Sequence, residues 1–162
     1  MDEKFLVLYG AAYDRLVPTI TTMAGSASPM AKEFTSDIVQ RKNLAYVTHG
    51  GPNQTLDLYA LKNAKQVPLI VWIHGGAFLF GSKEGFPVEP VPLHFLLEGY
   101  AIASINYRLS PEALFPAQLE DCKAAIRWLR AHADEFGIDP NRIGGLGRLC
   151  RRESGGAARD HR

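Results

Sequence analysis

Apolar stretches separated by turn-forming residues dominate the middle of the chain. Two half-buried stretches, 44–47 and 56–61, flank the turn-forming run Gly50-Gly51-Pro52-Asn53. This arrangement predicts an antiparallel hairpin. Two further runs, 67–73 and 101–107, are apolar on both alternating faces, which is typical of strands buried in the middle of a sheet that helices cover.

Helical patterns occur between and after these strands. A short amphipathic stretch, 93–97, separates the two buried strands, and apolar residues recur at steps of three and four over 116–133. The second pattern predicts a helix of about five turns, at roughly 3.6 residues per turn. Gly137 and Asp139-Pro140 end it, and a third buried strand is expected from Arg142. Strands alternating with helices predict an α/β fold with a mostly parallel sheet.

The two ends of the chain lack such patterns. Residues 1–43 show only a weak helical pattern, and we expect a lead-in or a cap over the sheet there. Residues 147–162 contain five arginines but no valine, isoleucine or aromatic residue. Such a segment cannot bury enough apolar surface to offset the entropy of ordering, so it is expected to be an out-of-frame or disordered tail. The chain is therefore divided into 1–43, 44–146 and 147–162.

Composition and charge narrow the function classes only slightly. The 162 residues are 46% hydrophobic and 22% charged, which suits one globular domain, and a net charge of +1 gives no reason to expect a nucleic-acid partner. Cys122 and Cys150 are too few for a disulfide framework and too far apart for a CxxC metal site. No signal peptide or membrane-spanning run is recognisable, so the default expectation is a cytoplasmic location without stable membrane insertion.

One motif suggests chemistry: His74-Gly75-Gly76-Ala77-Phe78 directly follows the predicted strand 67–73. Glycines let the backbone turn sharply and bring N–H groups close to a bound atom, because no Cβ stands in the way. Donors placed in this way can stabilise the negative oxygen of a tetrahedral intermediate in acyl transfer. Taken alone, a Gly-Gly turn after a strand is more often only a turn.

Several other motifs accompany this one, in order along the chain: Val71–Phe78, Gly81–Ser82, Asn106–Glu112, Phe115–Ala117, Leu119–Cys122 and Asp139–Gly144. With them, the chain from about residue 44 to 146 resembles the hormone-sensitive-lipase-like and carboxylesterase branch of the α/β-hydrolases. The resemblance implies the N-terminal half of an α/β-hydrolase fold. It also implies a serine-dependent carboxylic-ester hydrolase (esterase or lipase) that acts on a small-molecule acyl ester and needs no metal or cofactor.

The resemblance also implies site residues. The family's HGGG-type oxyanion loop corresponds here to His74-Gly75-Gly76-Ala77, with alanine in place of the last glycine. The N–H groups of Gly75, Gly76 and Ala77 would be the donors. Alanine keeps its N–H group, so this departure need not abolish the oxyanion hole. His74 is expected to support the loop through a structural hydrogen bond instead of acting as a general base.

Three other polar residues receive no catalytic role. In this family the acid of the catalytic Ser-Asp/Glu-His triad follows the serine nucleophile in the chain. Asp121 lies before the place where that serine is expected, so we expect Asp121 to pair with a base such as Arg108. Ser82 and Ser110 lack the strained turn that exposes a nucleophilic hydroxyl.

The family's nucleophile lies in a G-x-S-x-G elbow after the next strand, followed by an acid and then a histidine. No such motif occurs in the chain, and residues from Gly145 read GLGRLCRRESGG. Codons read one base later from codon 147 would permit Gly-Ala-Ser-Ala-Gly-Gly-Asn-Leu, with the serine at the Leu149–Cys150 boundary. We therefore expect a frameshift, natural or from sequencing, and a truncated chain that lacks the triad and is inactive alone.

Other functions stay open. A non-catalytic binding module that reuses a hydrolase sheet would unfold cooperatively, whereas a fragment that lacks later strands should expose apolar surface and aggregate. An amidase, formamidase or peptidase of the same fold would carry the same loop. A nucleic-acid-binding tail is disfavoured, because Glu153 and Asp160 dilute the positive charge and no aromatic residue is present for stacking.

Overall fold

The computed structural model describes residues 7–8, 37–88, 95–96 and 98–147. Within this part of the chain, six strands form one sheet in the order β1-β6-β4-β5-β3-β2. The strands are β1 (Val7–Leu8), β2 (Ile38–Ala45), β3 (Thr55–Leu61), β4 (Val67–Ile73), β5 (Ala101–Ile105) and β6 (Ile138–Gly147). The helices are α4 (Ala117–Ala131) and α5 (Ala133–Phe136), with 3-10 turns η1 (Pro52–Gln54) and η2 (Lys83–Val88).

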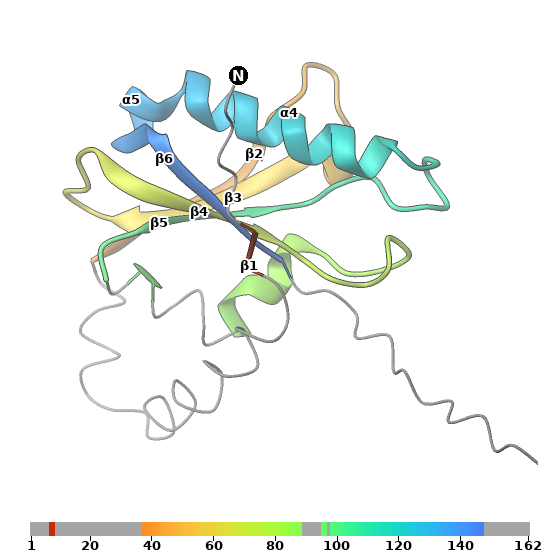
Figure 1. The fold of residues 1–162 in the computed structure, drawn as a ribbon, viewed down its shortest axis with the longest axis horizontal. Helices are drawn as coiled ribbons and strands as arrows, with labels where there is room; N and C mark the ends of the chain where they lie inside the picture. Colours follow the sequence, from red (N-terminus) through yellow and green to blue (C-terminus); the bar gives the residue numbers. More distant parts are fainter. Residues whose placement is uncertain (1–6, 9–36, 89–94, 97, 148–162) are drawn as a thin grey trace, which may run out of the picture.

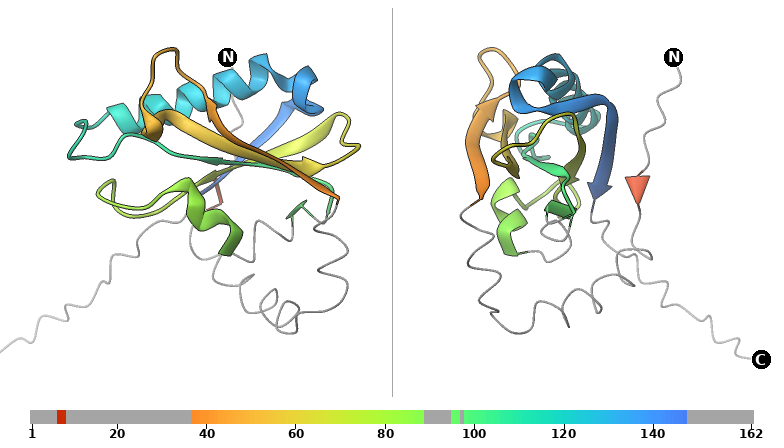
Figure 2. Two further views of the ribbon diagram at one scale, coloured as in Figure 1. Left: turned by 180° about the vertical axis from the view of Figure 1, so that it is seen from behind. Right: turned by 90° about the vertical axis from the view of Figure 1, so that its left-hand side faces the viewer.

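The helices divide between the two faces of the sheet. Figure 1 shows α4 and α5 lying across one face, and η2 lies on the opposite face; the reverse and side views in Figure 2 agree. Among the described residues, no helix is both long enough and apolar enough to cross a membrane.

The predicted hairpin is confirmed, because β2 pairs antiparallel with β3, with Ala45 opposite Thr55. Its first strand is longer than predicted, since it begins at Ile38 and not at Leu44. Most of the added residues are exposed on both faces of this edge strand, so they carry no alternating apolar pattern that a sequence argument could detect. A bulge between Arg41 and Leu44 interrupts the pairing.

The centre of the sheet is parallel, as predicted. Strand β4 lies between β5 and β6 and runs parallel to both, with Ile73 opposite Ile105 on one side and Gly147 on the other. The helical segment ends before Gly137, as predicted, but strand β6 begins at Ile138 and not at Arg142, so Asp139-Pro140 lies inside the strand. The proline is accommodated where the pairing with β4 shifts register, a position that needs no regular ladder hydrogen bond.

Two apolar clusters fill the two faces of the sheet. The larger cluster packs α4 and α5 onto the strands and includes Leu56, Leu69, Val71, Ala125, Leu129, Phe136 and Ile138. The smaller cluster covers the other face and consists of Tyr59, Trp72, Leu96, Ile102 and Leu146. The predicted helix over 116–133 is confirmed as α4, whose buried positions include Ala125 and Leu129. Of the predicted stretch 93–97, residues 93, 94 and 97 lie outside the described part of the chain.

The segments at the two ends are described only in part. Strand β1 pairs parallel with β6, with Val7 opposite Gly145, and most of β2 also falls within residues 1–43. The parts of segment 1–43 that form β1 and β2 therefore belong to the sheet. Residues 9–36 and the predicted tail from residue 148 lie outside the described residues, so the division of the chain into three segments stays a prediction.

Asp121 ties the start of α4 to the loop that follows β5. The Arg108 guanidinium contacts both carboxylate oxygens of Asp121 at 2.8 Å, and the backbone N–H of Arg108 donates to Oδ2 at 3.0 Å. Gln54 Nε2 donates to Oδ1 at 2.9 Å. Burial alone would raise the pKa of Asp121, but these donors outweigh it and hold the pKa below its ordinary value. The predicted structural pairing with Arg108 is confirmed.

Replacement of this carboxylate should destabilise the fold. We expect Asp121→Asn to lower the free energy of unfolding by about 1.5–3 kcal/mol, because it weakens hydrogen bonds to a charged group and sets one amide against the surrounding donors. Urea denaturation at neutral pH measures the loss. Glu120→Gln is the matched control, since Glu120 is an exposed neighbour on the same helix, and it should change stability by much less. Equal losses in the two variants would contradict the assignment.

The same carboxylate should make stability depend on pH. Because its pKa is lower in the folded chain, its contribution is present above the ordinary value of about 3.9 and is lost as the pH falls through the lowered folded value. The stability difference between the wild type and Asp121→Asn should therefore shrink in acid below about pH 4. Denaturation curves over a pH series measure this difference, and a gap that stays constant into strong acid would argue against it.

Candidate active site

The glycine-rich loop leaves the sheet at the carboxyl end of its central strand. Strand β4 ends at Ile73, and residues 74–82 connect it to η2. Strand β6 ends at Gly147, directly opposite Ile73. Because β4 and β6 are parallel, whatever follows Gly147 leaves the sheet at the same edge as the loop. In α/β sheets this edge is where ligands bind.

The loop backbone adopts the left-handed conformation at three successive residues. Gly76 has φ 126°, Ala77 has φ 52° and Phe78 has φ 64°. Only glycine fits at position 76, because an added Cβ would collide with the carbonyl oxygen of Phe80. The two non-glycine residues cost of order 1–3 kcal/mol each in such conformations, so the surrounding contacts must hold them in place.

Backbone hydrogen bonds close the loop and join it to its neighbour. The N–H groups of Leu79 and Phe80 both donate to the Gly76 carbonyl, at 2.9 and 3.3 Å. The N–H of Ser110, in the loop after β5, donates to the Phe78 carbonyl at 2.6 Å. The loops after β4 and β5 therefore form one connected structure.

The three predicted oxyanion donors lie together at the start of this loop. Among the described groups, none accepts a hydrogen bond from the backbone N–H of Gly75, Gly76 or Ala77. These N–H groups are thus available to an acceptor from outside the described residues, as an oxyanion hole requires. Their assignment as donors stays a prediction.

His74 holds the base of the loop. It is buried, its Nδ1 lies 2.9 Å from the Gly75 carbonyl, and its ring stacks on Tyr107 at 4.3 Å between centroids. The Tyr107 hydroxyl donates to the His74 carbonyl at 2.8 Å. Burial lowers the pKa of His74, and the bond to Gly75 opposes this shift. A neutral, hydrogen-bonded imidazole agrees with a supporting role. Tyr107 lies in one of the recognised motifs, but the sequence did not show that it contacts His74.

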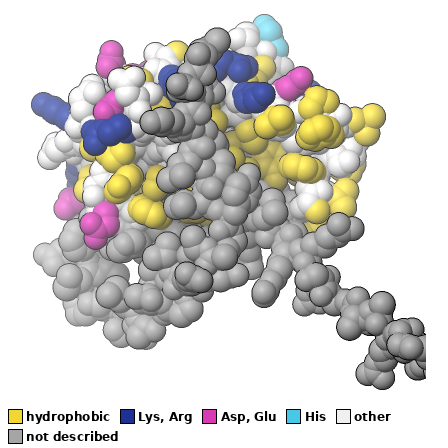
Figure 3. Space-filling view, in the orientation of Figure 1, with side chains coloured by type: hydrophobic (Ala, Val, Ile, Leu, Met, Phe, Trp, Pro, Cys, Tyr) yellow, Lys and Arg dark blue, Asp and Glu magenta, His cyan; other side chains and the backbone are white. Residues whose placement is uncertain are grey.

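The glycine-rich loop and the loop after β5 carry exposed apolar side chains. The loops after β4 and β5 lie at the right of Figure 1, and Figure 3, in the same orientation, shows hydrophobic side chains gathered on that side. The residues are Phe78, Leu79, Phe80, Leu114 and Phe115. An exposed apolar surface of this kind is typical of a ligand-binding or protein-binding region.

The other candidate nucleophiles of the described chain have no catalytic surroundings. Ser82 hydrogen-bonds to Glu84 and lowers the pKa of that carboxyl, and the Ser104 hydroxyl donates to the carbonyl of Lys83. No serine hydroxyl within the described ranges is hydrogen-bonded to a histidine. Burial raises the pKa of Cys122 to about 12, so its thiol is unreactive at neutral pH. The predicted serine position at Leu149–Cys150 lies outside the described residues.

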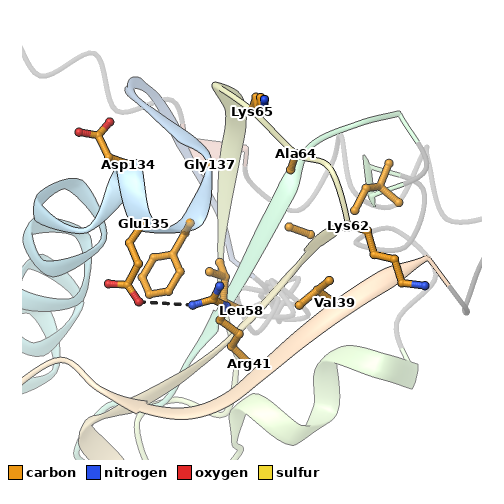
Figure 4. Close-up of a pocket in the computed structure, with 12 residues that line it drawn as sticks. Val39, Arg41, Leu58, Lys62, Ala64, Lys65, Asp134, Glu135 and Gly137 are labelled. Carbon is orange, nitrogen blue, oxygen red and sulfur yellow. Dashed lines mark hydrogen bonds and ion pairs between the residues drawn. The ribbon is translucent and has the colours of Figure 1, made fainter.

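No group of three or more His, Cys, Asp and Glu side chains suited to a metal ion occurs in the described ranges. A cavity of about 290 Å³ lies between β2, β3 and α5 (Figure 4), and the ion pair between Arg41 and Glu135, at 3.3 Å, lies at its wall. Ala64 and Gly137, which precede β4 and β6, also line it. The cavity is therefore at the opposite end of those strands from the glycine-rich loop and does not belong to the candidate site.

Comparisons with known proteins agree with this fold. The chain is 34% identical over 109 residues to Esterase LipC of Mycobacterium tuberculosis, a match that covers 65% of this chain and 26% of LipC. Carboxylesterase NlhH of the same species is 38% identical over 78 residues, which covers 48% of this chain and 24% of NlhH. The chain thus spans about a quarter of the length of these curated relatives.

Solved structures match over a larger share of the chain. A structure described as a truncated form of carbohydrate esterase from gut microbiota has a TM-score of 0.62 and 34% identity, and the match covers 67% of this chain and 39% of that one. A bacterial heroin esterase has a TM-score of 0.59 and 34% identity, and the match covers 85% of this chain and 40% of that one.

A family model, BD-FAE, matches residues 56–156. The match includes the glycine-rich loop, α4 and β6, and it continues past Gly147 into residues outside the described part. It spans well over half of the chain. The chain therefore belongs to the BD-FAE family, and its sheet is the N-terminal half of an α/β-hydrolase esterase fold.

Proposed function

We propose that this chain carries the oxyanion loop of a serine carboxylic-ester hydrolase, with the N–H groups of Gly75, Gly76 and Ala77 as donors. The observation that supports this most directly is the register of β4 and β6, which sets Ile73 opposite Gly147. A nucleophile elbow that directly follows β6 would bring its serine hydroxyl to the edge where the loop begins. The donors would then face the oxygen that becomes negative when the serine attacks the ester.

The proposed reaction divides its work among four groups. The serine oxygen attacks the acyl carbon, a histidine takes the proton and returns it to the leaving alcohol, and an acidic residue orients the histidine. A water molecule, deprotonated by the same histidine, then attacks the acyl-enzyme, and the carboxylic acid leaves as the proton returns to the serine oxygen. The loop stabilises the oxyanion. Exposed apolar side chains of this loop and of the loop after β5, including Phe80 and Phe115, would contact the apolar part of a small acyl ester. No step in this scheme uses a metal or cofactor.

We further propose that a reading-frame shift near codon 147 separates the loop from its nucleophile. The support is that β6 keeps regular pairing with β4 up to Gly147, while the written sequence beyond it contains no G-x-S-x-G. The shifted codons permit the elbow, with its serine at the Leu149–Cys150 boundary. The family match also includes Ser154, followed by Gly155-Gly156, but an arginine stands where the elbow requires its first glycine.

The nucleotide sequence tests the frame. We expect the frame one base later to stay open from codon 147 and to encode the elbow, further strands, an acidic residue and then a histidine. This order follows from the chain order of the triad in this fold. Sequencing several hundred bases of genomic DNA gives the answer. A downstream region without an acidic residue and a histidine in any frame would contradict the proposal.

The 162-residue chain should show no saturable hydrolysis of p-nitrophenyl acetate, because it lacks the groups that form and resolve an acyl-enzyme. Initial rates over a range of ester concentrations measure this. Ser154→Ala is the control for the serine in the written frame. Saturable turnover that disappears in Ser154→Ala would assign the nucleophile to that serine and refute the frameshift. A cooperative thermal transition without turnover would instead favour a binding module.

In the chain translated from the shifted frame, Gly76→Ala should lower kcat by roughly 10²–10³-fold, because the added Cβ displaces the loop and its donors. Gly85→Ala is a matched control, since an added Cβ there meets nothing within 4 Å, and it should leave kcat unchanged. Steady-state kinetics with p-nitrophenyl acetate compare the two variants. An undiminished kcat in Gly76→Ala would argue against the oxyanion assignment.

A further inference from the structure

A buried ion pair lies directly beyond the glycine-rich loop. Lys83 Nζ lies 2.7 Å from Asp57 Oδ1, and the two side chains are only 3% and 4% exposed. Lys83 begins η2, whereas Asp57 lies in β3, so the pair joins the end of the loop segment to the sheet. Removing two charges from water is costly unless their remaining hydrogen-bonding capacity is satisfied.

The surrounding groups satisfy both charges. Lys83 Nζ also donates to Asn43 Oδ1 at 2.8 Å and lies 3.2 Å from a carboxylate oxygen of Glu84. Three acceptors therefore meet the three donors of the ammonium group. Asp57 Oδ1 accepts a further hydrogen bond from the backbone N–H of Asn43 at 2.8 Å. Asn43 lies at the bulge of β2 with φ 57°, which turns both its backbone and its side chain to this cluster.

The end of β5 holds the backbone at both ends of the loop. The Lys83 N–H donates to Asn106 Oδ1 at 2.6 Å, and the Lys83 carbonyl accepts from Ser104 Oγ at 2.9 Å. Tyr107, the next residue after Asn106, donates to the carbonyl of His74 at the other end of the loop. The loop is thus fixed at His74 and at Lys83 against the same short segment.

The position of Lys83 is transmitted to the predicted donors by close backbone packing. Gly81 has φ 104°, and a Cβ added there would collide with the Gly75 carbonyl and with the His74 ring. Gly81 therefore packs directly on the residue that begins the donor set. Only Ser82 separates Gly81 from Lys83, so a displaced Lys83 would also displace Gly81 and Gly75.

We infer that Lys83 is a positioning residue, whose buried ion pair with Asp57 sets the orientation of the N–H groups from Gly75 to Ala77. This inference rests on the proposed function of those groups. Stability alone does not account for the pair, because a well-packed apolar pair of similar volume is often as stable as a buried ion pair or more so. An apolar pair would supply no directional contacts. The ammonium group of Lys83, in contrast, can reach all three of its acceptors from only one position.

The test separates stability from loop geometry in the chain translated from the shifted frame, in which Gly76→Ala is also compared, because the 162-residue fragment is expected to aggregate. Lys83→Met leaves Asp57 buried and unpaired, so it should lower Tm, and the double variant Lys83→Met/Asp57→Leu should recover Tm because no buried charge remains. Loop geometry is measured by amide hydrogen exchange at Leu79, Phe80 and Ser110, whose N–H groups are bonded within the loop or to it.

We expect these three amides to exchange at least roughly tenfold faster than in the wild type in both Lys83 variants, while amides of α4 in the double variant keep their wild-type rates. Lys62→Met is the matched control: Lys62 forms an exposed ion pair with Asp37, and its replacement should change neither Tm nor loop exchange. Wild-type loop exchange in the double variant would overturn the inference, because the pair would then contribute stability alone.

This measurement involves no catalysis, so the two proposals can fail separately. Faster loop exchange in the Lys83 variants, together with an undiminished kcat in Gly76→Ala, would refute the oxyanion assignment. Lys83 would then remain a residue that orients the loop. Unchanged loop exchange in the double variant Lys83→Met/Asp57→Leu, together with a lowered kcat in Gly76→Ala, would refute the role of Lys83. The oxyanion assignment would then remain valid.

Discussion

The parallel pairing of β4 with β6 is the constraint on which the rest of the candidate site depends. It places the last residues of both strands, Ile73 and Gly147, side by side at one edge of the sheet. A loop rich in backbone donors leaves β4 there, and the chain that follows β6 leaves at the same edge. Without this register, the glycines after β4 would be only a turn, because no second segment would reach them.

A loop with three successive left-handed residues is not stable by itself, and the structure shows what holds it. The end of β5 anchors both of its ends, through Tyr107 at His74 and through Asn106 at Lys83. The loop therefore rests on hydrogen bonds to a rigid strand end. This is how a strained backbone can keep N–H groups in one orientation before a ligand arrives.

Apolar packing and polar clusters contribute differently to this fold. The apolar clusters attach α4 and α5 and make the sheet stable, whereas Asp121 with Arg108 and Asp57 with Lys83 fix individual loops against it. Buried charges of this kind contribute less net stability than their short distances suggest, because desolvation offsets much of the attraction. Their directional contacts determine which geometry the loops adopt.

Local patterns in the sequence were sufficient to predict the buried strands, α4 and the motif at His74-Gly75-Gly76. Buried elements and turns can be recognised from the spacing of apolar residues and from turn-forming residues within a short stretch of sequence. The pairing of Asp121 with Arg108 was also predictable, since the two residues are near in sequence. The start of β2 at Ile38 was not, because an exposed edge strand has no apolar alternation. Only the tertiary structure decided that Lys83 meets Asp57 and that Tyr107 meets His74. These partners come from different elements, with Asp57 in β3, Lys83 in η2, and His74 and Tyr107 in the segments after β4 and β5. The strand order that brings them together is a property of the whole sheet, which no local pattern encodes.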